Sequence, residues 1–300
     1  MEVTRQRTRN FIRCYDQAEK NNHTYAVPSK WEECDAPTFV RLSKAMWNFE
    51  NGHTDFETFK IEIVAACLGI DIPSTRLTDF LGVNFFTLSG LLTFPYRLVA
   101  NRDGSETAYI DIEMKRNLFP SADGYRYETD KAGVIDCTLT AAQYTAGISL
   151  VNLQSGYVRA YREDEALEVL DPLVRLLYSG KCGFSVYERI AVMYNFRGIL
   201  ESIRRDESYS LVFRKAGQKA EANPVGSNSG IFALTKAGYG DFDAVSRMDV
   251  HSFLSAMVQQ TVDSIHTLQG SGMKPGKIAD KLNLSVEQVL PFTSITEEEE

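Results

Sequence analysis

Histidine and cysteine are the residue types in this sequence best suited to metal binding and nucleophilic catalysis. They are His23, His53, His251, His266, Cys14, Cys34, Cys67, Cys137 and Cys182. The cysteines are widely spaced without a CxxC pair, and no histidine lies in an HExxH pattern, so neither a zinc site nor a disulfide framework is indicated. We therefore expect no metal, no cofactor and a cysteine usage typical of a reducing compartment.

Motifs for nucleotide binding and hydrolysis fail on spacing. A phosphate-binding loop needs Gly, four residues and then Gly-Lys-Ser/Thr. Here Gly270 and Gly272 stand six and four positions before Gly276, and Ile278 replaces the hydroxyl residue. No GxSxG nucleophile elbow is present. We therefore expect no catalytic residues and a protein that is not an enzyme.

The composition is that of a globular protein, with 300 residues, of which 44% are hydrophobic and 24% charged, and a net charge of −8. This negative charge argues against a nucleic-acid partner. The longest apolar stretch, Phe85–Leu92, is far shorter than the roughly 20 residues that a membrane span needs. The polar segment Met1–Lys20 lacks the apolar core of a secretory signal. We expect a soluble protein in the cytoplasm, without a membrane partner.

Helical periodicity recurs along most of the chain. Asp35 and Pro37 are typical of a helix start, and Thr54 with Glu57 forms a capping-box pair for the next helix. A similar helical hairpin follows from Thr140, and duplication and coincidence both remain open as its origin. The expected helices, with their caps, cover residues 3–20, 35–52, 54–69, 140–156, 166–180, 184–205 and 249–262.

A small β insertion is expected to interrupt this helical body near residues 95–128. Pro95–Ala100 and Thr107–Met114 are rich in strand-forming residues and flank Asn101-Arg102-Asp103-Gly104, where Asp-Gly is typical of a hairpin turn. The expected fold is mainly α, with packed helical hairpins, this insertion and a C-terminal segment like a helix-turn-helix. We expect a body over residues 1–215, a linker over 216–230 and a small helical domain with an acidic tail over 231–300.

The segment Gly276–Val289 has the layout of a helix-turn-helix and resembles the DNA-reading modules of bacterial regulators and sigma factors. Its second helix is short, because Pro291 follows. A helix that reads DNA needs basic or amide side chains on its exposed face, and this one offers Gln288 beside the acidic Glu287. Because of the helix-turn-helix layout, the alternative function is a DNA-binding regulator that uses residues 273–290. Its DNA contacts would be Lys274, Lys277, Lys281 and Gln288.

Several stretches together resemble proteins from the tail-gene clusters of Bacteroidota phages and prophage-like elements, including tail assembly chaperones. They are Val27–Glu33 with Phe39–Leu42, Leu139–Tyr144 with Leu173–Tyr178, Val186–Leu200, and Gly240–Val245 with Met248–Leu254. The resemblance implies a non-enzymatic structural or assembly protein of a phage or phage-like tail. Its partners would be other tail proteins or further copies of itself, in the bacterial cytoplasm or within a virion-like particle.

The aromatic helices are the expected contact sites for these partners. We expect Phe39, Met46, Trp47, Phe253 and Met257 to contribute to an exposed apolar patch larger than a few hundred Å².

Overall fold

The computed structural model describes residues 10–16, 21–70, 84–130, 133, 135–179, 183–213 and 228–293. The fold is mainly helical with two-stranded β-hairpins, as expected. The chain divides into an N-terminal unit, which holds residues up to Gly124 and Leu150–Glu201, and a C-terminal unit, which holds Tyr125–Ser149 and Ser202–Glu300. The expected linker at 216–230 lies largely outside the described residues and stays a prediction.

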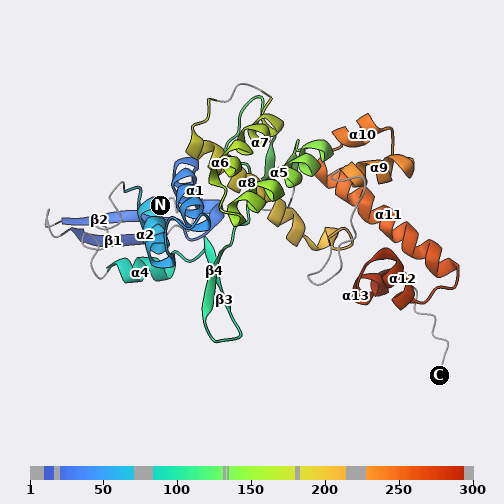
Figure 1. The fold of residues 1–300 in the computed structure, drawn as a ribbon, viewed down its shortest axis with the longest axis horizontal. Helices are drawn as coiled ribbons and strands as arrows, with labels where there is room; N and C mark the ends of the chain where they lie inside the picture. Colours follow the sequence, from blue (N-terminus) through green and yellow to red (C-terminus); the bar gives the residue numbers. More distant parts are fainter. Residues whose placement is uncertain are drawn as a thin grey trace, which may run out of the picture. The chain divides into compact units, whose positions relative to one another are not determined.

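The N-terminal unit combines helices with two hairpins (Figure 1). Its elements are β1 (Asn10–Asp16), β2 (Asn21–Val27), η1 (Trp31–Glu33), α1 (Ala36–Glu50), α2 (Phe56–Leu68), α4 (Asn84–Leu91), β3 (Tyr96–Ala100), β4 (Glu106–Ile110), α6 (Glu163–Glu168) and α7 (Leu170–Leu177). Two further helices, α5 (Ala141–Arg159) and α8 (Val186–Arg205), contribute residues to both units.

The expected helix over residues 3–20 is wrong for residues 10–16, which form β1 and pair antiparallel with β2, and the rest of that span lies outside the described residues. Phe, Ile, Cys and Tyr are dense in this segment, and such side chains favour a strand over a polar helix. The expected helix stop near Gly156 is also wrong, since α5 continues to Arg159.

Helix starts in the N-terminal unit follow local capping chemistry. The Asp35 carboxylate accepts a hydrogen bond from the Thr38 N–H at 2.9 Å and begins α1 as expected. For α2 the cap is Asp55, which accepts from the Thr58 N–H at 2.8 Å, and the capping box expected at Thr54 is therefore one residue out. Such caps fix where each amphipathic helix begins and hence which face it buries.

The core of the N-terminal unit lies between α1, α2 and α8. Phe39 and Met46 of α1, Phe59 of α2, and Phe196 of α8 are all fully buried. Gly198 of α8 allows a close approach, since its carbonyl accepts from the Met114 N–H at 3.0 Å and an added Cβ would lie 2.4 Å from Met114 Cγ. This contact fixes the segment that follows β4 against the helical core.

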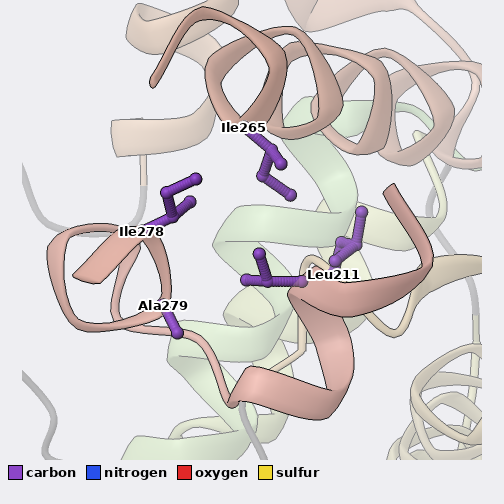
Figure 2. Packing of buried hydrophobic residues seen from close by; sticks show 5 residues of the cluster. Leu211, Ile265, Ile278 and Ala279 are labelled. Carbon is purple, nitrogen blue, oxygen red and sulfur yellow. The ribbon is translucent and has the colours of Figure 1, made fainter. Parts of the chain in front are cut away.

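The C-terminal unit is built around one long helix. Its elements are β5 (Tyr127–Thr129), β6 (Ile135–Cys137), η2 (Glu207–Tyr209), α9 (Ser229–Lys236), α10 (Phe242–Arg247), α11 (Val250–Gly270), α12 (Pro275–Leu282), α13 (Val286–Val289) and η4 (Leu290–Phe292). Figure 2 shows Ile265 of α11 pointing toward Ile278 of α12 and Leu211, and these residues form one buried cluster with Ala279 and Val289. The helix-turn-helix-like segment is therefore packed onto α11.

Candidate protein-binding surface

The hairpin of β3 and β4 extends from the helices of the N-terminal unit (Figure 1). Aromatic side chains pack together at its base. The Phe94 ring meets Trp31 edge to face with centroids 4.8 Å apart, and the Trp31 indole N–H donates to the Asp111 carbonyl at 3.0 Å. At the start of β3, the Tyr96 ring lies 5.0 Å from the Phe56 ring of α2. These contacts hold both ends of the hairpin against the core.

The turn that joins the strands has the chemistry expected from Asn-Arg-Asp-Gly. The Gly104 N–H donates to the Asn101 carbonyl, and Gly104 adopts a φ of +82°, which suits the left-handed residue of a three-residue loop. Asp103 accepts from the N–H and hydroxyl of Ser105, and these bonds lower the pKa of its carboxyl group. The turn thus fixes the register in which Leu98 faces Ala108.

Large apolar side chains are exposed on both faces of this hairpin. Leu98 is 46% exposed, Val99 37% and Tyr109 48%. Because side chains alternate along a strand, Leu98 projects from one face while Val99 and Tyr109 project from the other. Apolar side chains are therefore exposed to solvent on both faces of one hairpin, and such exposed apolar groups are suited to contact with another protein chain.

The outer edges of the hairpin are also free of strand partners. In the described part of the chain, β3 and β4 pair only with each other. At one end of the β3–β4 ladder the Asp111 N–H donates to the Pro95 carbonyl, and at the other end the Asn101 N–H donates to the Ser105 carbonyl. Hydrogen-bonded pairs alternate along an antiparallel ladder, so the odd-numbered residues make the hydrogen bonds between the two strands. The backbone groups of the even-numbered residues, such as Leu98, point outward to a site where another strand can add.

Comparisons with models of protein families, with curated proteins and with solved structures give no match. Among the described residues, no helix is long and apolar enough to cross a bilayer.

The expectation that the aromatic helices form an exposed patch is wrong. Phe39, Met46, Trp47 and Phe253 are buried, and Met257 is half-buried. The Trp47 indole N–H donates to Glu163 at 2.8 Å, within the same unit. An apolar stripe at helical spacing has the same sequence whether it packs in a core or binds a partner, and here it packs in cores.

The expected DNA contacts divide into exposed lysines and a buried glutamine. Lys274, Lys277 and Lys281 are exposed, whereas Gln288 is only 6% exposed. The Gln288 side chain completes a capping box with Ser285, and its amide group also donates to the Ser210 carbonyl. Gln288 as a base contact is therefore wrong, and α13, with the sequence Val-Glu-Gln-Val, presents no basic side chain to a groove.

Titratable groups in the C-terminal unit gather where the β5–β6 hairpin meets the start of α11. The Tyr209 hydroxyl lies 2.7 Å from His251 Nδ1, and the Tyr127 ring lies 5.6 Å from the His251 ring. Burial raises the pKa of the Cys137 thiol to about 11, so it remains protonated near neutral pH, unlike a nucleophilic thiolate. Among the described residues, no group of three His, Cys, Asp or Glu could hold a metal ion.

An open groove of about 660 Å³ runs along α11 in the same unit. Its lining includes Tyr239, Asp263, Ser264, Thr267 and Lys281. The hydroxyls of Ser264 and Thr267 each donate to a carbonyl of their own helix at 2.8 Å, which is ordinary helix-surface chemistry. These two hydroxyls are therefore bonded to the backbone of their own helix.

A smaller apolar pair lies on α9 and α10. The rings of Phe232 and Phe242 are 5.0 Å apart, and both side chains are exposed. The sequence analysis did not single out these residues or the faces of the β3–β4 hairpin, which the structure shows as exposed apolar surface. The available signal was the adjacent Leu98-Val99 pair, which places apolar side chains on both faces of one short strand.

Proposed function

We propose that this chain is a non-enzymatic structural or assembly protein that acts by binding other protein chains in a phage or phage-like tail. The observation that carries the proposal is the β3–β4 hairpin, whose apolar side chains are exposed on both faces and whose outer edges have no strand partner among the described residues. A sheet of this kind binds a partner strand through main-chain hydrogen bonds and through pockets for its side chains.

The tail context of the proposal comes from the sequence stretches that resemble tail-cluster proteins, among them Val27–Glu33 and Leu139–Tyr144. The proposed partners are other tail proteins or further copies of the chain. The proposed location is the cytoplasm of a bacterial host, or the assembled particle.

The test is capture of partners from the native host by the tagged full chain, followed by mass spectrometry with and without nuclease. A double variant, Leu98→Lys with Tyr109→Lys, places two charges on the hairpin. The matched control, Val186→Lys with Tyr187→Lys, changes two equally exposed apolar residues of α8 in the same unit.

The wild-type chain and the control are expected to capture tail or baseplate proteins in both nuclease conditions, and the hairpin variant to lose them. Capture that depends on intact nucleic acid would overturn the proposal, and capture of the same tail proteins by the hairpin variant would overturn the assignment of the hairpin as the binding surface.

A further inference from the structure

The outward edge of β3 has the hydrogen-bonding groups for another strand. Leu98 and Ala100 direct their N–H groups away from β4, whereas the Tyr96 N–H already donates to the Thr93 carbonyl at 3.2 Å. Within the part of the chain that the structure describes, the central and distal parts of this edge are therefore open. It carries no proline or lysine, residues that commonly block such edges.

The sequence of β3 is compatible with pairing to itself. In an antiparallel pair centred on Leu98, Tyr96 faces Ala100 of the second copy, Arg97 faces Val99, and Leu98 faces Leu98. The only charged residue of the strand then faces an apolar one. Moving the centre to Arg97 would place two guanidinium groups opposite each other, and like charges opposed in this way destabilise a sheet.

The charges at the two ends of the hairpin do not oppose this register. Antiparallel pairing carries the tip of one hairpin, with its exposed Arg102 and Asp103, toward the base of the other. Next to Tyr96 at that base, the Glu57 carboxylate forms an ion pair with Lys60 Nζ at 2.7 Å. Each end therefore carries one charge of each sign, and no cluster of like charges is brought together.

We infer that the free edge of β3 pairs with β3 of a second copy in antiparallel register centred on Leu98, which joins two hairpins into one sheet. The bonds across the two-fold axis link the N–H and carbonyl groups of the two Leu98 residues, and the Ala100 N–H donates to the Tyr96 carbonyl of the second copy. The inference rests on the proposed assembly function and names a second copy of this chain as the partner of the hairpin.

The first test is disulfide trapping of the purified full chain with Leu98→Cys. Two residues opposed on the axis as a hydrogen-bonded pair have Cα atoms about 5.5 Å apart, within the range of Cα separations that a disulfide spans. The control is Tyr109→Cys, an equally exposed position on β4. The residues at position 109 of the two copies would lie about three strand spacings apart, or roughly 14 Å, which is beyond the reach of a disulfide.

The second test is the mass of the chain in solution by light scattering. The wild type is expected to be a dimer, Leu98→Lys a monomer, and Tyr109→Lys a dimer. An unchanged circular dichroism spectrum and thermal midpoint would establish that Leu98→Lys is folded, as expected for a position that is nearly half exposed.

A wild-type monomer at every soluble concentration would overturn the inference. So would a Leu98→Lys dimer, or equal trapping by Tyr109→Cys. If the chain is a monomer but the hairpin variant still loses tail proteins in the capture experiment, the second copy is excluded and the proposed function stands. If the dimer forms as described but no tail protein is captured, the proposed function fails and the inference stands.

Discussion

The Tyr209 hydroxyl lies 2.7 Å from Nδ1 of His251 and joins η2 to the first turn of α11. The other ring nitrogen, Nε2, is buried without a hydrogen-bond partner. Burial lowers the pKa of His251 below its ordinary value near 6.5, and it outweighs the opposing charges of Asp249 and Asp206. The imidazole is therefore neutral in the folded C-terminal unit near pH 7.

This geometry predicts that acid destabilises the C-terminal unit through His251. The unfolded chain binds the proton more tightly than the folded chain does. The free energy of unfolding therefore holds above about pH 6.5 and falls as the pH drops below that value. Hydrogen exchange of the α11 amides measures this, because Trp31 and Trp47 are the only tryptophans and both report on the other unit.

The control for this prediction is His251→Gln, which is expected to show a smaller loss of protection between about pH 7.5 and about pH 5.5 than the wild type. His266→Gln alters an exposed histidine on the same helix and should retain the wild-type loss. Identical pH dependence in the wild type and His251→Gln would contradict the prediction.

Gly198→Ala is predicted to destabilise the N-terminal unit by about 1–3 kcal/mol, since the new methyl group would overlap Met114 in a packed core. Gly156→Ala is the matched control. It lies in α5 within the same unit with no atom within 4 Å of an added Cβ, so it should stabilise by about 0.5–1 kcal/mol. Denaturant titration followed by tryptophan fluorescence measures both, and a change of the same sign in both variants would refute the assigned contact.

The features that the sequence predicted are those set by neighbouring residues. The Asp35 cap needs only the Thr38 N–H three residues away, and the hairpin turn needs only the conformational freedom of Gly104. Whether a side chain is buried depends on contacts distant in the sequence. Trp47 is buried, with its indole N–H bonded to Glu163, and no local pattern distinguishes such a residue from a partner-binding one.

Glu50 anchors a polar cluster within the core of the N-terminal unit. Its carboxylate lies 2.9 Å from Arg197 Nη1 and accepts a hydrogen bond from the fully buried Tyr194 hydroxyl at 2.7 Å. Glu50→Ala removes the partner of both groups, and we predict a loss of about 2–3 kcal/mol in the free energy of unfolding. This is below the cost for a fully buried pair, because Glu50 is partly exposed.

The comparison for Glu50 is Glu57→Ala, which breaks the ion pair with Lys60 on the surface of the same unit. An exposed pair of this kind contributes under about 1 kcal/mol. Tryptophan fluorescence again reports the unfolding free energy. Equal losses in the two variants would show that the buried cluster contributes no more than a surface pair.

Gln288→Ala separates a structural role from DNA reading. Gln288 caps α13 together with Ser285 and donates to the Ser210 carbonyl, so its removal should lower the stability of the C-terminal unit by about 1–2 kcal/mol. Lys277→Ala changes an exposed residue of α12 and should stay within about 0.5 kcal/mol of the wild type. Hydrogen exchange in α11 and α12 measures stability, and fluorescence anisotropy with duplex DNA at low salt measures binding. A Gln288→Ala protein of unchanged stability that loses a salt-sensitive DNA affinity would reverse the assignment, because an exposed base-reading glutamine would behave in that way.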